Sequence, residues 1–532
     1  MPIERQKFRQ LLTSGRFLYG AELVTTRGFE PPEQAGKIVE LGNALTSDPR
    51  IDWVSITDNP GGNVMLPPDW LAQLLRQKGA HIVIHLTCKD RNRNALETAA
   101  WRFASEGFDS VLAMTGDYPK AGYGGLATPV FDLDSVSLIA LLKAMNDGLP
   151  VPGRKGEMTQ LSKTDFYIGC AVSPFKREEN ELMPQYFKLL RKLSNGAHFV
   201  YSQLGYDMRK FHEIKLVLAA NGYATTPVIG NVYVLNKTVA GMFHRREVPG
   251  CVVSQKLFEL ANKYAGGPDK GKGFFFELAA KQLAVFKGLG FAGGYLGGVA
   301  KPDSFFEIIE KSKSYGENDW KEFAKELQYP QENEFYLFEQ DPATGLGNPN
   351  QINRQYLASL KTPVETPNVT LGYRFSRLMH DKVFKPGTTG YRLMQRLYSG
   401  WDKQPAGKLP NAAHKLEHMS KFVFFGCKDC GDCSLPDVGY LCPLVSCSKG
   451  ARNGPCGGSS EGQCEMLDKQ CIWARAYDRL KYYGESEALV KGPAVFYDAR
   501  LKGTSAWANT FLGRDHQKNP PPAKTDSTKK EK

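Results

Sequence analysis

Eight of the eleven cysteines of this chain lie between Cys427 and Cys471. Three of them follow the spacing C-x2-C-x2-C. A segment so poor in large apolar residues cannot bury a core of its own, so it needs either disulfides or bound metal. The eight candidate metal ligands are Cys427, Cys430, Cys433, Cys442, Cys447, Cys456, Cys464 and Cys471.

The rest of the sequence favours metal over disulfides. The chain opens with MPIERQKFRQ and shows no apolar signal region and no transmembrane run. We therefore expect a cytoplasmic protein in a reducing compartment, with no membrane partner. Two C-x2-C steps that share a cysteine are typical of iron–sulfur ligation, with Cys442 beside Pro443 as a fourth ligand. Four-thiolate zinc sites use the same steps. The pattern predicts a metal-binding domain and leaves zinc and an iron–sulfur cluster open.

Composition sets broad limits on the function. The chain has 532 residues, of which 42% are hydrophobic and 23% charged, and these values predict two or three globular domains. The net charge is +12, but the basic residues are mixed with Glu along helical segments. Because no basic patch is interleaved with aromatic residues, we expect no nucleic-acid partner.

The first three hundred residues alternate short apolar runs with amphipathic segments of helical period. The seventh connection is longer than the others and is expected to hold more than one helix, including 272–288. Eight such units predict an α/β fold, the (β/α)8 TIM barrel. An open doubly wound sheet is the alternative, although no G-x-G-x-x-G follows the first strand. The predicted strands are 17–24, 51–58, 81–88, 109–116, 167–173, 198–205, 227–234 and 290–297.

Polar residues lie at the C-terminal ends of these strands, where a barrel carries its active site. Glu22 lies inside the first strand between Ala21 and Leu23, and an inward carboxyl is costly there unless it is paired or catalytic. Each of the others could be structural when taken alone, but their position at one rim favours an active site. They are Thr57, Asp58, His85, Thr87, Asp117, Ser173, Gln203, Asn231 and Tyr295.

These strand ends resemble those of methylenetetrahydrofolate reductases. The segments A-E-L, V-S-I-T, H-L-T-C-K-D, T-G-D-Y-P and Y-S-Q occur in the order and strand positions seen in that family, over roughly residues 1–310. The resemblance implies a flavin-binding (β/α)8 barrel. The cysteine region, with L-C-P, C-S-K-G and N-G-P-C-G-G, resembles the small partner subunit that accompanies this reductase in acetogenic bacteria, and also C-terminal extensions of its homologues.

The resemblance implies a hydride transfer in two steps. NAD(P)H would reduce bound FAD, and 5,10-methylenetetrahydrofolate would then take the hydride to become 5-methyltetrahydrofolate. Glu22 matches the family's general acid, for which a raised pKa is useful. Asp117 matches an aspartate near flavin and folate, and Gln203 matches a folate contact. The implied cofactor-binding residues are Thr57, His85, Gly116, Asp117, Arg191 and Lys192.

The chain also departs from the family. The family often has R-G-D where this chain has Thr115-Gly116-Asp117, so one cationic flavin contact is missing. The alternatives are a flavin-independent reductase, an FMN enzyme, a non-catalytic folate- or flavin-binding module, and a folate-dependent methyltransferase with thiolate zinc. Only Cys88 and Cys170 lie near strand ends, which is too few for such zinc. Family members are commonly oligomeric, so a homo-oligomer is expected.

The sequence divides into four parts. Residues 1–310 form the predicted reductase barrel, and 311–425 form a connecting arm with amphipathic helices, whose Leu and aromatic positions are interpreted as core. Residues 426–512 form the cysteine-rich metal-binding domain with a helical end. The domain could be structural, carry electrons to the flavin or dock a partner. The basic, Pro-rich tail 513–532 is expected to be disordered.

Overall fold

The computed structural model describes residues 7–28, 36–76, 80–153, 157–362, 364–403 and 407–517. Eight parallel strands form a closed barrel in the order β1-β10-β9-β8-β7-β4-β3-β2. Because β1 pairs with both β2 and β10, the sheet closes on itself. This confirms the predicted barrel over an open sheet. The strands are β1 Leu18–Leu23, β2 Trp53–Ile56, β3 His81–Thr87, β4 Ser110–Met114, β7 Tyr167–Val172, β8 Phe199–Ser202, β9 Val228–Tyr233 and β10 Gly293–Gly297.

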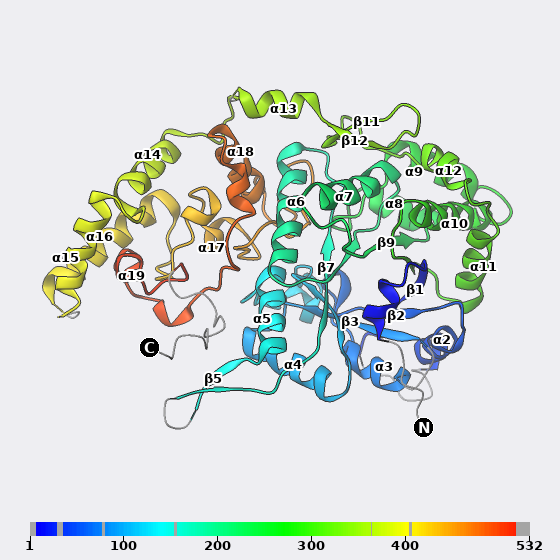
Figure 1. Cartoon of the computed structure of the whole chain (residues 1–532), viewed down its shortest axis with the longest axis horizontal. Coiled ribbons are helices and arrows are strands. Elements are labelled where there is room, and N and C mark those ends of the chain that lie inside the picture. Colours follow the sequence, from blue (N-terminus) through cyan, green and yellow to red (C-terminus); the bar gives the residue numbers. More distant parts are fainter. Residues whose placement is uncertain are drawn as a thin grey trace, which may run out of the picture.

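Helices follow the strands and cover the barrel from outside (Figure 1). The seventh connection contains three helices, which confirms the expectation for that segment. A short antiparallel hairpin, β5 Pro150–Pro152 with β6 Met158–Gln160, precedes β7. The helices of this part are α1 Phe8–Leu12, α2 Gly36–Ser47, α3 Pro68–Leu75, α4 Arg93–Ser105, α5 Ser135–Asp147, α6 Glu179–Ser194, α7 Met208–Ala220, α8 Lys237–His244, α9 Gln255–Ala265, α10 Lys272–Gly288 and α11 Pro302–Lys313.

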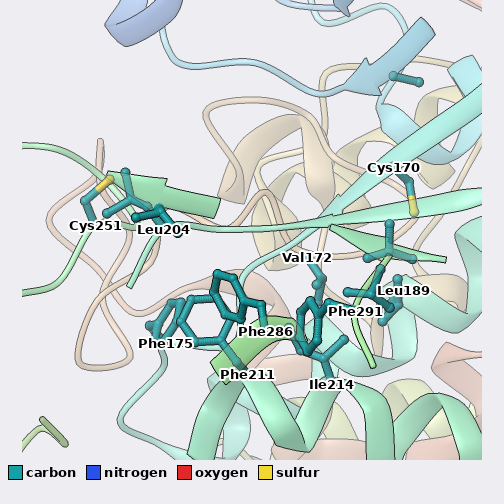
Figure 2. Close-up of a cluster of buried hydrophobic side chains, with 14 of the residues drawn as sticks. Cys170, Val172, Phe175, Leu189, Leu204, Phe211, Ile214, Cys251, Phe286 and Phe291 are labelled. Atoms are coloured by element: carbon teal, nitrogen blue, oxygen red, sulfur yellow. The ribbon is translucent and has the colours of Figure 1, made fainter. Parts of the chain in front are cut away.

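The core has an inner and an outer layer. Inside the barrel, buried aromatic residues such as Trp53 and Phe199 pack with Phe8, which comes from α1. Outside it, rings from several connections meet between strands and helices (Figure 2). Phe211 lies 5.0 Å from Phe175 and 4.7 Å from Phe286 between ring centroids. Side chains therefore fill both the barrel interior and the layer between strands and helices. In such a packed barrel the active site is expected at the C-terminal rim of the strands.

The connecting region continues from α12 Trp320–Glu326 through the hairpin β11 Phe338–Gln340 and β12 Gly347–Ile352 to α13 Arg354–Lys361. Three further helices, α14 Leu371–Met379, α15 Thr389–Trp401 and α16 Lys408–Phe425, extend away from the barrel (Figure 1). Within the part of the chain described, no helix is long and apolar enough to span a bilayer.

The interpretation of α14 and α15 as core-facing helices is only partly right. Tyr373 and Tyr391 are buried, as expected for core positions. Most of the leucines, however, lie on the opposite face and are exposed, because each helix packs through one stripe and leaves the other in solvent. The exposed apolar residues of these helices and α16 include Leu371, Phe375, Leu378, Leu393, Leu397, Leu409, Leu416, Met419, Phe422, Val423 and Phe424.

The cysteine region is built mostly of turns, with α17 Pro443–Ser446, α18 Ile472–Tyr482 and α19 Ala506–Leu512. Helix α18 packs against α6, where the Tyr477 hydroxyl donates a 2.6 Å hydrogen bond to Glu179. The described structure continues beyond residue 513, the expected start of the disordered tail. There His516 is buried between Asp432 and Asp437. The rest of the predicted disordered tail, 518–532, lies outside the described residues.

Candidate active site and cysteine clusters

Glu22 is a half-buried acid on β1, directly opposite Ser55 of β2. The last residue of β10, Gly297, leaves space for this carboxyl, since a Cβ atom at Gly297 would lie 2.4 Å from Oε2 of Glu22. Burial raises the pKa of Glu22 to about 7, although the nearby Tyr295 hydroxyl opposes this. The Tyr295 hydroxyl is itself buried and lacks a hydrogen bond of good geometry. Glu22 can therefore hold a proton near neutral pH.

Asp117 follows β4, and its carboxylate accepts a 2.8 Å hydrogen bond from the backbone N–H of Gly61. The preceding Gly116 has φ +88°, a conformation that favours glycine. Asp117 and Glu22 belong to one rim, because both charges act on the thiol of Cys251. Burial is the main reason that the pKa of Cys251 is raised to about 12, and the two carboxylates add to it.

His85 on β3 is a buried imidazole whose Nε2 has no hydrogen-bond partner. Burial lowers its pKa to about 4 against the pull of Asp58, so the ring is neutral at physiological pH. Thr57 directly follows β2, and its backbone N–H donates a 3.0 Å hydrogen bond to the Leu23 carbonyl of β1. Asp58 has a structural role, since it accepts hydrogen bonds from the N–H and hydroxyl of Thr87.

Gln203 follows β8, and its side-chain oxygen accepts a 2.9 Å hydrogen bond from the N–H of Leu204. Its amide nitrogen points toward Gly250, in the loop between α8 and α9. The nearby Ser173 hydroxyl is buried and unpartnered. Gly457 of the cysteine region lies against both Ser173 and Gly250. The cysteine region therefore reaches the rim on which the predicted folate contact lies.

Arg191 and Lys192 lie near the C-terminal end of α6, and backbone carbonyls hold their charged ends. Arg191 donates a 2.6 Å hydrogen bond to the Pro493 carbonyl, and Lys192 donates one of 2.5 Å to Ala171. Burial lowers the pKa of Arg191 and brings that of Lys192 down to about 8. Arg191 thus contacts the C-terminal segment in this structure, and a role of either residue toward a cofactor phosphate stays a prediction.

A cavity of about 110 Å³ lies between the barrel rim and the cysteine region. Both carboxylate oxygens of Glu181 in its wall are buried without a hydrogen-bond partner. Lys176, also in the wall, donates hydrogen bonds to the carbonyls of Gly457 and Ser459. Sequence reasoning missed Lys176, because 281 positions separate it from its partner Gly457.

The eight cysteines of the cysteine region form two sets of four. Cys427, Cys430, Cys433 and Cys442 line one cavity of about 20 Å³ together with Pro443, so the predicted fourth ligand lies with the C-x2-C-x2-C run. In the second set, Cys447 and Cys471 both interact electrostatically with Cys456, and Cys447 also with Cys464. All eleven cysteines are free. No group of three or more His, Cys, Asp or Glu side chains is arranged to hold a metal ion within the described residues. Metal binding therefore stays a prediction.

The structure thus combines a closed (β/α)8 barrel, a carboxyl with a raised pKa at its rim and an appended cysteine region. A family model described as Methylenetetrahydrofolate reductase matches residues 7–286, which is more than half of the chain. A second, described as Methylene-tetrahydrofolate reductase C terminal, matches residues 408–496. The chain belongs to the methylenetetrahydrofolate reductase family and is an enzyme, which confirms the resemblance of its barrel. The resemblance of the cysteine region to a partner subunit stays a prediction.

The solved structures that match this chain are distant from it. An uncharacterized protein from Clostridium thermocellum that binds two copies of 5-methyl-5,6,7,8-tetrahydrofolic acid is 12% identical, with a TM-score of 0.42 over 57% of this chain and 96% of that one. A putative deoxyribose-phosphate aldolase from Toxoplasma gondii ME49 is 12% identical, with a TM-score of 0.29 over 58% and 97%. No curated protein matches the chain. Such distant likeness bears on neither substrate nor mechanism.

Proposed function

We propose that the protein reduces 5,10-methylenetetrahydrofolate to 5-methyltetrahydrofolate by flavin-mediated hydride transfer from NAD(P)H, with Glu22 as general acid. The observation that carries the proposal is the half-buried carboxyl on β1, with its pKa near 7, in a barrel of this family. A carboxyl with an ordinary pKa would be ionised at neutral pH and could not donate a proton.

The acid has a defined task in this reaction. Glu22 gives its proton to the leaving nitrogen of the imidazolidine ring, the carbon–nitrogen bond breaks, and the ring opens to an iminium. The bridging carbon then accepts the hydride. Asp117 lies on the same rim and is proposed to tune flavin and folate, while Gln203 is proposed to contact the folate. The reaction can also run in the oxidative direction, which would serve one-carbon catabolism rather than methionine biosynthesis.

The rim suits a large polar cofactor such as FAD. His85 Nε2 and Ser173 Oγ are buried and unpartnered, and such atoms cost free energy unless a ligand or water satisfies them. Bound FAD would accept the hydride from NAD(P)H and pass it on. We propose that these residues of the chain hold it: Thr57, His85, Gly116, Asp117, Arg191 and Lys192.

The two sets of four cysteines suit two thiolate sites, because four thiolates are the usual ligand set of structural zinc and of iron–sulfur clusters. We propose a mainly structural role for the metal, which would replace the hydrophobic core that this turn-rich region lacks. A homo-oligomer and a cytoplasmic location are part of the same proposal.

An absorption spectrum of the purified protein, with metal analysis of the same sample, tests the proposal. We expect a flavin band near ~450 nm that bleaches on addition of NAD(P)H. Iron with a broad shoulder near ~400 nm would identify iron–sulfur clusters, and zinc without it would identify zinc sites. A colourless protein that binds no added flavin would contradict the flavin step and leave the flavin-independent reductase or the methyltransferase.

A further inference from the structure

Helix α16 has its polar and apolar sides in the reverse of the usual arrangement. Its buried face carries Glu417 and Lys421, which form a 2.8 Å ion pair. Glu417 also accepts hydrogen bonds from the Ser505 hydroxyl and from the backbone N–H of Trp507, at the start of α19. A surface helix normally buries its apolar stripe and exposes its polar one. Charge and hydrogen bonds therefore hold the inner face of α16, and an apolar face is left in solvent.

The outer face of α16 carries apolar residues at coiled-coil spacing. Leu409, Ala412, Leu416, Met419 and Val423 follow one another at alternating steps of three and four positions. All five are exposed, and the four larger side chains are between 60% and 72% exposed. We call these five residues the outer stripe. Their spacing is that of positions a and d of a heptad, through which one helix packs against another.

The charges around the outer stripe are positive. Residues 371–425, which include α14, α15 and α16, contain ten Lys and Arg but only three Asp and Glu. With Leu409 and Leu416 at position a, Lys408 and Lys415 take position g, where charge selects the partner of a coiled coil. Neither lysine forms an ion pair within the described residues. The three acids already have cations of this chain beside them: Arg377 beside Asp381, Arg514 beside Asp402, and Lys421 beside Glu417.

A second copy of the chain does not suit the outer stripe. The e positions of the same heptads are Ala413 and Ser420, so a paired α16 offers no acid to Lys408 or Lys415. The chain's own residues 518–532 do not suit it either, because they contain no Leu, Ile, Val, Met or aromatic residue and are rich in lysine.

The outer stripe also differs from a face that lies on a bilayer. A helix at a membrane surface presents a broad apolar face, whereas a strict a/d stripe is the narrower seam of helix pairing. The exposed Phe422 and Phe424 widen the seam only at its C-terminal end. The spacing and the charges together match an apolar helix flanked by acids.

We propose that the outer stripe of α16 docks an amphipathic helix of a partner protein, which has apolar residues at coiled-coil spacing and acidic residues beside them. The stripe ends four positions before Cys427. Lys421 and Phe425 of the same helix line the cavity of the first set of cysteines. The partner is therefore seated beside that set and away from the barrel (Figure 1). This inference does not rest on the proposed reaction.

The test uses the full-length protein and two synthetic helical peptides as probes. Both peptides carry leucine at positions a and d over about three heptads, and one has glutamate and the other lysine at positions e and g. Binding of the labelled peptides is measured by fluorescence anisotropy. L416S interrupts the centre of the outer stripe, and K408E/K415E reverses the two charges. L74S is the matched control, because Leu74 is an exposed leucine of the barrel helix α3.

We expect the wild type to bind the glutamate peptide at least about 10-fold more tightly than the lysine peptide. L416S should weaken binding of the glutamate peptide at least about 10-fold, since the central apolar contact is lost. K408E/K415E should prefer the lysine peptide, and L74S should behave as the wild type. Thermal melts should be alike, because all the substituted side chains are exposed.

Three results would overturn the inference. The first is equal binding of both peptides, or L416S with the affinity of the wild type, which would reduce the interaction to unspecific charge attraction. The second is a wild-type oligomer that L416S dissociates in light scattering, which would assign the stripe to a second copy. The third is flotation of the wild type but not of L416S with phosphatidylglycerol/phosphatidylcholine vesicles, which would assign it to a membrane. None of them bears on the proposed function, which the flavin spectrum tests separately.

Discussion

Glu22 shows how burial on a barrel strand can bring the pKa of a carboxyl close to neutral pH. Burial disfavours the charged carboxylate and raises its pKa to about 7, while Tyr295 opposes this only in part. The position of the carboxyl depends on Gly297 of β10, because a Cβ atom there would lie 2.4 Å from Oε2 of Glu22. Burial thus sets the pKa of Glu22, whereas Gly297 sets the position of its carboxyl.

We expect G297A to lower kcat/KM for methylenetetrahydrofolate about 10- to 100-fold, because the added Cβ must displace the carboxyl and small misplacements of catalytic groups are costly. Stability should change little, since the clash is with the end of a flexible side chain. The measurement is steady-state kinetics with a thermal melt. G400A is the control, because no atom approaches that position within 4 Å. Wild-type activity in G297A would contradict the role of Gly297.

Sequence and structure agree where the signal is local. The strands were predictable because apolar runs alternate with helical segments, and Glu22 was noticeable as a carboxyl among apolar neighbours. Lys176 and Glu181 were not predictable, because their surroundings are formed by segments far apart in the chain. The exposure of Leu393 and Leu397 was also missed, since helical spacing marks a face but does not say whether another element covers it.

At the scale of elements, Asp134 joins helix capping to domain docking. It caps α5 through hydrogen bonds from Val136 and Ser137, and it accepts others from Asn453. Burial opposes its ionisation, but the charge of Lys188 and the hydrogen bond from Asn453 outweigh this and lower its pKa. A single carboxylate thus stabilises both the barrel helix and the contact with the cysteine region.

We expect D134A to destabilise the protein by about 2–4 kcal/mol, more than the roughly 1 kcal/mol typical of a lost N-cap, because it also leaves buried donors of Asn453 unsatisfied. The measurement is urea denaturation followed by circular dichroism. N92A is the control, since Asn92 caps only α4 through the N–H of Ala95. Equal losses in D134A and N92A would show that the contact with Asn453 adds no stability.

At the scale of the whole molecule, the C-terminal segment is tied to the first set of cysteines through His516. Its imidazole forms hydrogen bonds with Asp432 and Asp437, residues on either side of Cys433. Burial lowers the pKa of His516, but the two aspartates outweigh it and raise the pKa to about 10. The ring is therefore charged at neutral pH and connects the end of the described chain to the cysteine region.

The stabilisation from His516 should depend on pH with a definite sign. Its folded pKa lies above the unfolded value of about 6.5, so the contribution is complete below that pH and is lost as pH rises toward 10. We expect H516Q to destabilise the protein by about 3 kcal/mol at pH 6 and progressively less up to pH 10. Calorimetry across this range is the measurement, and a pH-independent difference would contradict it.

The central claim is that Glu22 protonates the folate after the flavin has been reduced, and anaerobic stopped-flow measurement of the two half-reactions of E22Q tests it most directly. We predict that NAD(P)H reduces the flavin of E22Q at a rate close to that of the wild type. Reoxidation by methylenetetrahydrofolate should collapse in E22Q, and in the wild type it should slow as pH rises through about 7. Wild-type reoxidation in E22Q, with the same pH profile, would contradict the account.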